Sequence, residues 1–449
     1  MLFSAPARLR ASLTTLGEHR SVTFAVLVDT IGAGLTLPLT IVYFTLTTDV
    51  PLAVIGALST VASLVALPIG LLGGVLTDRF GAKTSMITNN LMSAAGFALY
   101  LVAHDPVSVF AAVFLANASE RLYWTAWTAY VHDLADGRPF ERWFSFLEAT
   151  KAAALGAGAV VAAVTLAQGQ DGLRWLVLAN VVTSVLAAVV FATQSTGGRV
   201  VPPVRTTPDA TSAPGATSAH DATGRLDATN PPDPHDRADA RATLRAFAAD
   251  RSMRLITLGQ FLIGPAMVLP NVALSVLFVQ QWHLPPAVAP VQFAVTTALC
   301  AALQTTVTRA VAGRRRGTLI AAGATLTGLT VLPLVVLPSL TGTAAWTYVV
   351  LSAVTMAFAD MVTMPATNAV LAEAPHPRIR GRAIGVFQTA SSVGMALFPL
   401  TLGLLDSPAP WLLWAIATVV FLGAAWSWHA ALRGLPERVQ RASVADLEA

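Results

Sequence analysis

Charged residues are scarce in this chain of 449 residues, of which only 12% are Asp, Glu, Lys or Arg. Soluble globular chains carry about 25%, so a soluble class is excluded. Cysteine occurs once, as Cys300, which leaves no intrachain disulfide and no cysteine-based metal site. Lysine occurs only as Lys83 and Lys151. The formal net charge of +4 is spread over short segments, so no nucleic-acid partner is expected.

Apolar residues, in contrast, make up 55% of the chain and gather in long runs. A helix of about 20 apolar residues spans the hydrocarbon core of a bilayer, and twelve runs approach that length. They lie at about 22–46, 52–76, 84–103, 107–132, 143–167, 173–194, 254–279, 287–309, 318–338, 343–372, 384–405 and 409–432. We therefore predict an all-α membrane protein with twelve transmembrane helices. The first run is too long for the core of a cleavable signal peptide.

The distribution of Lys and Arg predicts the orientation of these helices. If the N-terminus is cytoplasmic, all but three of the 28 lie in cytoplasmic segments; the exceptions are Arg121, Lys151 and Arg174. The positive-inside rule then places both termini in the cytoplasm, and we expect a multi-pass protein of a bacterial inner membrane. The expected organisation is a cytoplasmic tail, a six-helix bundle, a cytoplasmic linker, a second six-helix bundle and a cytoplasmic tail, at 1–21, 22–194, 195–250, 251–432 and 433–449.

The expected linker is rich in Pro, Thr, Ala, Asp and Arg and has almost no aromatic residue. Such a segment cannot bury enough apolar surface to fold, so we predict that it is disordered. Its His220 and His235 stand far apart without partner ligands. No metal site is expected.

The fourth apolar run carries two charges near its middle, Glu120 and Arg121. Ionisable residues at mid-bilayer depth are costly and usually face a cavity or a partner, which makes both functional candidates. Tyr123, Trp124 and Trp127 follow at helical spacing from Glu120 and share its face. An acidic, aromatic face of this kind suits a cavity that receives organic molecules.

Three more charges lie within apolar runs of the first half. A carboxylate such as Asp29 would be desolvated at that depth, which favours its neutral form and allows it to take up a proton near neutral pH. The alternative is a packing role in which it bonds to a neighbouring hydroxyl. Glu148 and Lys151 are three residues apart on one helix and can pair with each other, or Glu148 can reach Arg121. We expect Glu120, Arg121, Glu148 and Lys151 to form one balanced cluster.

The segment 74–83 contains Gly74, Leu76, Asp78, Arg79, Gly81 and Lys83 in the pattern Gly-x-Leu-x-Asp-Arg-x-Gly-x-Lys. This pattern after the second helix resembles the signature loop of the major facilitator superfamily. The resemblance implies two six-helix bundles around a central cavity. It also implies that Gly74, Asp78, Arg79, Gly81 and Lys83 act as a gating latch between the two halves.

Arg121 resembles the buried arginine on the fourth helix of the drug-proton antiporters of this superfamily. The fifth helix has no Gly-Pro antiporter signature, because Leu155-Gly156-Ala157-Gly158 stands in its place. The resemblance therefore favours proton-coupled transport but leaves export and import open.

An internal repeat relates the two halves. An offset of 232 residues relates Pro38 to Pro270 and Gly32 to Gly264, and one of 240 relates Glu120 to Asp360. The repeat is typical of transporters that bind substrate between their halves. It makes Asp360 the counterpart of Glu120, while Arg121 has no charged counterpart because it maps to Met361.

These observations favour a secondary transporter that exports a hydrophobic or cationic organic molecule by alternating access. The coupling ion is predicted to be the proton, carried by Asp29, Glu120 and Asp360, with no other cofactor. The expected partners are a small substrate and the lipid bilayer, and the protein is expected to be a monomer. Proton-coupled uptake of a small metabolite is the alternative. A non-transporting sensor or an intramembrane enzyme is a third interpretation, although no catalytic constellation is evident.

Overall fold

The computed structural model describes residues 20–135, 140–169, 171–193, 247, 249–337, 339–376 and 380–441. Nearly all of the expected linker and of the N-terminal tail, together with residues 442–449, lies outside these ranges, so the predictions for these segments are not tested. The described part of the chain is helical, and its one isolated β-bridge joins Arg315 to Arg441.

Six helical segments form the N-terminal half. They are α2 (Arg20–Thr36) continued by η1 (Leu37–Leu39) and α3 (Thr40–Thr47), then α4 (Leu52–Phe80), α5 (Ala82–Val102), α6 (Pro106–Ala135), α7 (Phe140–Ala167) and α8 (Gly172–Thr193). At the start of α6, Asp105 accepts bonds from the backbone N–H groups of Val107 (2.9 Å) and Ser108 (3.2 Å). The bond from the Ser108 hydroxyl and these backbone bonds lower the pKa of Asp105 below its usual value. This is an N-cap, which satisfies donors that the first helical turn leaves free.

Six more segments form the C-terminal half. They are α10 (Arg251–Ile263) continued by η2 (Gly264–Met267), η3 (Pro270–Leu274) and η4 (Leu277–Gln281), then α11 (Val288–Ala310), α12 (Arg316–Val331) with η5 (Leu332–Val335), α13 (Gly342–Glu373), α14 (Arg380–Leu397) with η7 (Phe398–Leu404), and α15 (Trp411–Arg433). A short α16 (Glu437–Gln440) follows. The twelve predicted segments correspond to these twelve helical segments.

Ten of the segments are long and apolar enough to cross a membrane, by length and composition. The other two are α5 and α6. Their polar residues reduce the mean hydropathy: Asn89 and Asn90 lie within α5, and Glu120 and Arg121 lie within α6. One of the two exceptions is therefore α6, the helix whose Glu120 and Arg121 are functional candidates.

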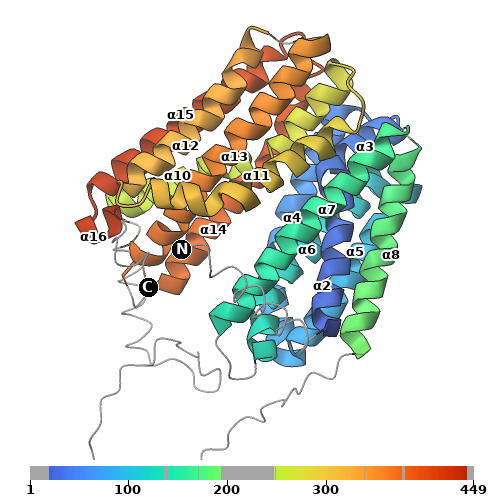
Figure 1. Cartoon of the computed structure of the whole chain (residues 1–449), viewed down its shortest axis with the longest axis horizontal. Coiled ribbons are helices and arrows are strands. Elements are labelled where there is room, and N and C mark those ends of the chain that lie inside the picture. The colour runs from blue at the N-terminus through green and yellow to red at the C-terminus, as the bar shows by residue number, and fades with distance from the viewer. Residues whose placement is uncertain are drawn as a thin grey trace, which may run out of the picture.

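The two halves meet at one end and diverge toward the other (Figure 1). We call the end at which α3 and α5 finish the closed end, and the end at which α2 begins and α8 finishes the open end. At the closed end one continuous core joins Phe44 and Tyr100 to Phe278, Trp282 and Leu402 of the other half. Near the open end, each half has a buried core of its own.

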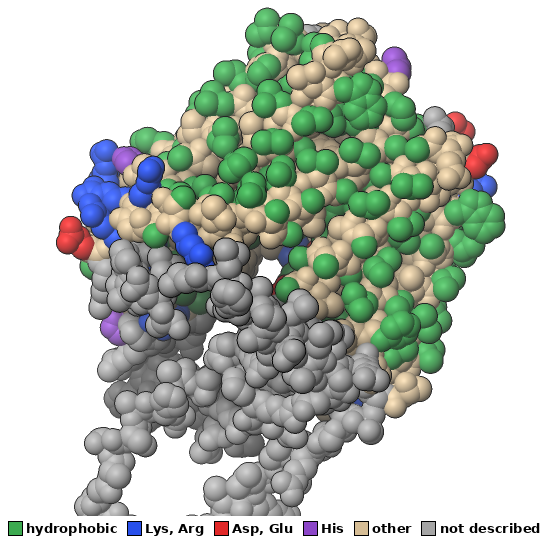
Figure 2. All heavy atoms as spheres, viewed as in Figure 1, with side chains coloured by type: hydrophobic (Ala, Val, Ile, Leu, Met, Phe, Trp, Pro, Cys, Tyr) green, Lys and Arg blue, Asp and Glu red, His purple; other side chains and the backbone are tan. Residues whose placement is uncertain are grey.

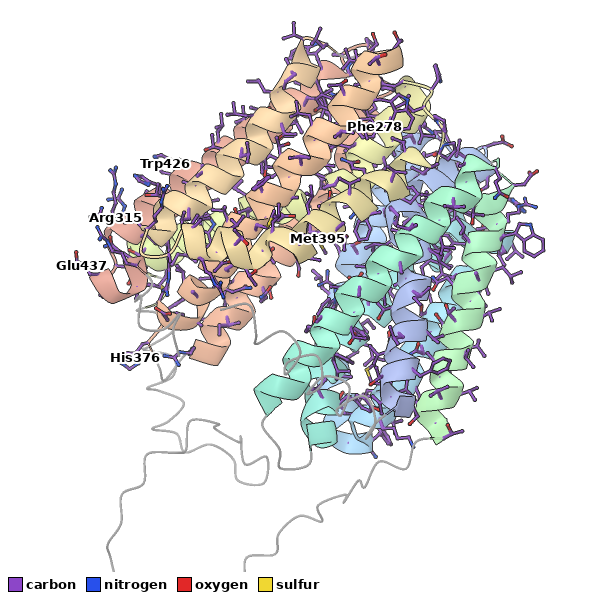
Figure 3. The ribbon with its side chains drawn as sticks, in the orientation of Figure 1. Phe278, Arg315, His376, Met395, Trp426 and Glu437 are labelled. Atoms are coloured by element: carbon purple, nitrogen blue, oxygen red, sulfur yellow. The ribbon has the colours of Figure 1, made fainter. Side chains whose placement is uncertain are left out.

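Backbones touch directly where the halves meet. A Cβ at Gly56 on α4 would overlap the carbonyl oxygen of Pro399 in η7, and one at Gly403 would lie 2.8 Å from the Cβ of Ala53. Such close approach is possible only for small residues, as in other membrane helix pairs. Figure 3 places Phe278 near this junction and Met395 farther toward the open end, beside the N-terminal half.

The same glycine crossing occurs once in each half. In the first half, added Cβ atoms at Gly34 and Gly158 would overlap the carbonyl oxygens of Leu155 and Ile31. The second half has the matching arrangement, in which Cβ atoms at Gly264 and Gly394 would overlap the carbonyl oxygens of Ser391 and Phe261. The α2–α7 pair is thus the counterpart of the α10–α14 pair.

This crossing corrects the register of the repeat. Gly264 corresponds to Gly34, an offset of 230 residues, and Gly394 to Gly158, an offset of 236. Gly32, which the sequence spacing paired with Gly264, faces Thr183 and Asn180 of α8 instead. The offset of 232 therefore does not hold for Gly32 and Gly264, and the correspondence of Glu120 with Asp360 stays a prediction.

The outer faces of both halves are apolar. Trp175, Val419 and Trp426 are 68%, 69% and 61% exposed, and hydrophobic side chains cover much of the visible surface between the ends (Figure 2). Lys and Arg side chains gather at the open end of the C-terminal half in the same view. An apolar band with polar ends is the surface that a membrane-spanning protein presents to lipid.

Candidate functional site

Lys151 on α7 lies against three aromatic rings of α6. Its Nζ is 4.6 Å from the ring centre of Trp127, 5.0 Å from that of Trp124 and 5.1 Å from that of Tyr123. Tyr123 and Trp127 stack with their centres 5.5 Å apart. An ammonium within about 6 Å of an aromatic ring centre is attracted by the electron-rich ring face. We call these three rings the aromatic cage.

Glu148 completes the cage with a carboxylate. Its Oε1 accepts a bond from the Nζ of Lys151 at 2.9 Å and one from the indole N–H of Trp127 at 2.8 Å. The Lys151 side chain is 13% exposed and that of Glu148 is 37% exposed. Of the two pairings predicted for Glu148, the structure has the one with Lys151. The indole bond fixes the carboxylate beside the ammonium.

Asp29 on α2 lies within electrostatic range of the Lys151 ammonium and of the Tyr123 hydroxyl. Its side chain is partly buried, and it makes no hydrogen bond or ion pair with any residue that the structure describes. The packing alternative required a bond to a neighbouring hydroxyl, and the described residues provide none. Asp29 therefore lies beside the cage as a carboxylate without a bonded partner in this part of the chain.

Glu120 and Arg121, the two charges near the middle of α6, do not join the Glu148–Lys151 pair. Arg121 donates from Nη1 to the Oγ of Ser392 on α14 at 3.0 Å, which links the two halves. Glu120 is exposed, and its described contact is a long bond of 3.5 Å from the indole N–H of Trp124. The expected four-charge cluster is thus corrected, because Arg121 reaches across to α14 while Lys151 pairs with Glu148.

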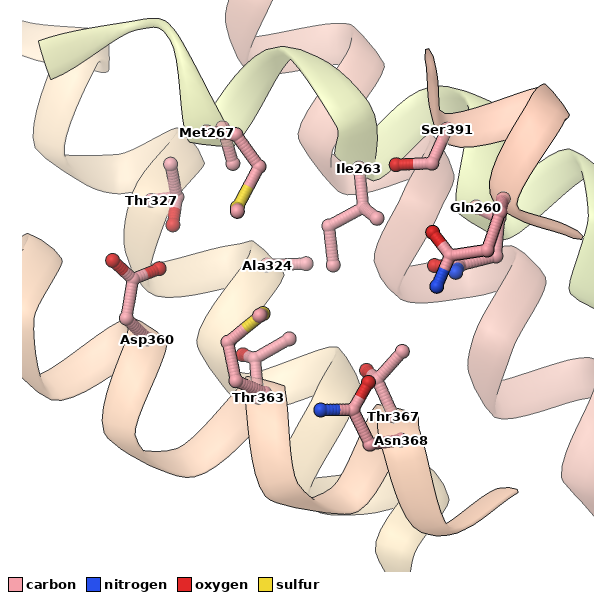
Figure 4. A pocket seen from close by; sticks show the side chains of 13 residues that line it. Gln260, Ile263, Met267, Ala324, Thr327, Asp360, Thr363, Thr367, Asn368 and Ser391 are labelled. Carbon is pink, nitrogen blue, oxygen red and sulfur yellow. The ribbon is translucent and has the colours of Figure 1, made fainter. Parts of the chain in front are cut away.

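In the C-terminal half, Asp360 lines a cavity of about 110 Å³. The other lining residues are Gln260, Ile263, Ala266, Met267, Ala324, Thr327, Thr363, Met364, Thr367, Asn368, Gln388 and Ser391. Figure 4 shows the Asp360 carboxylate near Thr327 on one side of this space and Asn368 beside Thr367 on the other. The cavity combines amides, hydroxyls and one carboxylate with apolar walls.

The sequence contains a signal for this cavity that the charge pattern alone missed. Asp360, Thr363, Met364, Thr367 and Asn368 follow one another at helical spacing, so they share one face of α13. This polar face, rather than Asp360 alone, could have indicated a cavity. Within the described residues, Asp360 makes no hydrogen bond or ion pair.

The signature loop lies at the open end, between α4 and α5. Gly81 has φ +86°, a conformation that favours glycine and allows the tight turn between the helices. The Nζ of Lys83 donates to the carbonyl of Ala192 at the end of α8 at 3.0 Å, and Arg79 lies over the ring of Phe80. Gly74 lies within α4 near Thr125 of α6. The side chain of Asp78 is outside the described set, so its gating role stays a prediction.

No group of three or more His, Cys, Asp or Glu side chains within the described ranges could hold a metal ion. The candidate site comprises the aromatic cage with Glu148 and Lys151, the nearby Asp29, and the polar cavity around Asp360. These groups belong to two repeated six-helix halves. That is the architecture of a secondary transporter.

The sequence profile of the Major Facilitator Superfamily matches residues 22–399 and 255–445. The chain belongs to this family, so it is a multi-pass membrane transporter of small molecules and not an enzyme. The resemblance seen in the signature loop is confirmed.

Curated relatives match a shorter region. The chain is 38% identical over 96 residues to the multidrug resistance protein MdtH of Enterobacter sp. (strain 638) and 36% identical over 96 residues to that of Salmonella typhimurium. In both comparisons the match covers 21% of this chain and 23% of the relative. The chain thus spans about a quarter of the length of these relatives.

Solved structures match nearly the whole chain. A point mutant of the nucleoside transporter NupG has a TM-score of 0.69 at 13% identity, and the match covers 92% of this chain and 98% of that one. The D-xylose-proton symporter has a TM-score of 0.64 at 15% identity, with 96% and 99% covered. A point mutant of the peptide transporter POT has a TM-score of 0.69 at 12% identity, with 94% of each chain covered. At these identities the likeness shows the fold.

Proposed function

We propose that the protein is a proton-coupled exporter of hydrophobic organic cations. The observation that carries this proposal is the aromatic cage, in which three rings and Glu148 surround a positive charge. Trp124 is 58% exposed, so the cage is open on one side. Aromatic rings with a nearby carboxylate are the groups that recognise quaternary ammonium and other organic cations. The short match to multidrug resistance proteins supports export of organic compounds.

Proton coupling is assigned to the carboxylates that have no bonded partner among the described residues. Asp29 on α2 lies within electrostatic range of Lys151 on α7 and of Tyr123 on α6. Asp360 lies in the polar cavity of the other half. Carboxylates inside a membrane protein commonly form proton relays. We infer that protonation of Asp29 and release of a cation from the adjoining cage are linked by charge, with Glu120 as a further proton site on the same face.

The open end is assigned to the cytoplasm by the positive-inside rule, as is each terminus. Two halves that are joined at the closed end and apart at the open end then correspond to an inward-facing state. A cation would enter the cage from the cytoplasm, and rocking of the halves would open the other side. The membrane is proposed to be a bacterial inner membrane.

Proton-coupled uptake of a small polar metabolite is the second candidate. The amides and hydroxyls around Asp360 favour it, because such groups bind sugars, nucleosides or peptides by hydrogen bonds. The structurally similar proteins include a nucleoside transporter and a D-xylose-proton symporter. The two candidates differ in which half binds the substrate.

Counterflow in proteoliposomes separates the candidates. Vesicles loaded with unlabelled methylphenylpyridinium are expected to take up the labelled cation transiently. Matched vesicles loaded with uridine, dialanine or xylose are expected to give no signal for those compounds. Counterflow of a metabolite without counterflow of the cation would support uptake instead. Failure with every compound would count against both candidates.

A further inference from the structure

The aromatic cage is occupied by a cation that belongs to the protein itself. Lys151 Nζ makes the contacts that a bound organic cation would make: three ring faces at 4.6 to 5.1 Å and one carboxylate oxygen at 2.9 Å. An ammonium and a substrate cation cannot both fill this space. A cation that uses the cage must therefore move Lys151 out of it.

The structure also provides a place for the displaced ammonium. Asp29 on the neighbouring α2 interacts with the charge of Lys151 and has no bonded partner among the described residues. The lysine side chain is a flexible four-carbon stem with a compact charged head, so its ammonium can change position without movement of α7. Glu148 would remain in the cage, held by the indole N–H of Trp127 at 2.8 Å.

We propose that Lys151 is an internal competitor for the cation site, a tethered ligand that fills the cage until a cationic substrate displaces it toward Asp29. The inference rests on the proposed function for the identity of the substrate class. It adds a specificity-determining role for Lys151. Only cations that outcompete a tethered ammonium for the rings would be bound. Large delocalised cations meet this condition best, because they are weakly hydrated, so that removing them from water costs little free energy. They also cover more ring surface than an ammonium does.

The rarity of lysine makes the position of Lys151 directly observable. Lys83 and Lys151 are the two lysines in the chain, so a Lys83→Arg variant has a single lysine. Reductive methylation with isotope-labelled methyl groups keeps the charge and gives one side-chain signal, distinct from that of the terminal amine. Inside the cage this NMR signal should be shifted upfield by the ring currents. Addition of tetraphenylphosphonium should move it toward the value of an exposed lysine.

Variants test the competition by affinity. Lys151→Met keeps most of the length of the side chain and removes its charge, so tetraphenylphosphonium should bind at least about tenfold more tightly than to the Lys83→Arg parent. Adding Glu148→Gln should remove most of this gain, because the cage loses its carboxylate. Binding is measured by tryptophan fluorescence and by equilibrium dialysis on protein that elutes as one peak. Retention of the parent's unfolding temperature within a few degrees controls for folding.

Two results would overturn the proposal. An unshifted methyl signal without the probe would show that Lys151 does not occupy the cage. Equal or weaker binding by Lys151→Met, including no binding at all, would show that the cage is not a cation site for which lysine competes. These outcomes are separate from the proposed function, since counterflow of methylphenylpyridinium with an unshifted lysine signal would retain export and reject only the competitor.

Discussion

Arg121 and Ser392 form a hydrogen bond of 3.0 Å between α6 and α14, and so between the two halves of the protein. Along α6, Arg121 lies between Val113 of the closed-end core and Ala126 of the open-end core. A bond to a charged donor contributes about 1.5–3 kcal/mol when it is shielded from water. The bond therefore favours the arrangement seen here over states in which α6 and α14 separate.

Ser392→Ala should shift the protein away from this arrangement by about tenfold in population, corresponding to about 1.4 kcal/mol. The shift is measured as a change in the distance distribution between spin labels at Thr193→Cys and Arg433→Cys, after Cys300→Ser. Ser391→Ala is the matched control, because Ser391 lines the cavity but does not bond to Arg121. Equal distributions for Ser392→Ala and its parent would mean that the bond does not bias the two halves.

Two glycines of α14 are expected to respond in opposite ways to replacement by alanine. Gly394→Ala should reduce folded yield severely, because its Cβ would overlap the carbonyl oxygen of Phe261 and backbone atoms cannot move aside cheaply. Gly385→Ala should be neutral or stabilising by up to about 1 kcal/mol, since nothing lies within 4 Å and alanine favours helix. Folded yield and unfolding temperature in detergent are the readouts. Similar behaviour of both variants would contradict the crossing.

Gln304 supplies a hydrogen bond that Pro365 removes from α13. Proline has no N–H, so the carbonyl of Met361 one turn earlier has no donor within the helix. The Nε2 of Gln304 on α11 donates to that carbonyl at 3.1 Å. Gln304→Leu should therefore lower the free energy of unfolding by about 1 kcal/mol.

A double-mutant cycle isolates this effect. In a Pro365→Ala background the N–H at position 365 can bond to Met361, so Gln304→Leu should cost clearly less than in the parent. Thr305→Val, at an exposed position on the same helix, serves as the control for altered hydropathy. If Gln304→Leu costs the same in both backgrounds, Gln304 does not compensate for the proline.

The sequence was sufficient to predict the twelve helices because a bilayer requires long apolar runs whatever the tertiary structure is. The grouping of Tyr123, Trp124 and Trp127 on one face also followed from helical spacing. Pairings between helices could not be derived in this way. Arg121 and Ser392 are 271 positions apart, and nothing local indicates that they meet. The sequence spacing paired Gly264 with Gly32 wrongly for the same reason. Contacts between helices are needed to show which helix a glycine faces, and they pair Gly264 with Gly34.

Asp29 tests the central claim, which is that entry of a proton and exit of an organic cation are one electrostatic event at the aromatic cage. The measurement is uptake of labelled methylphenylpyridinium into proteoliposomes with an acidic interior, with the membrane potential clamped. The wild type should accumulate the cation as protons leave. Asp29→Asn should lose this accumulation yet keep exchange of labelled for unlabelled cation. Full pH-driven accumulation by Asp29→Asn, or movement of the cation in the same direction as protons, would contradict the account.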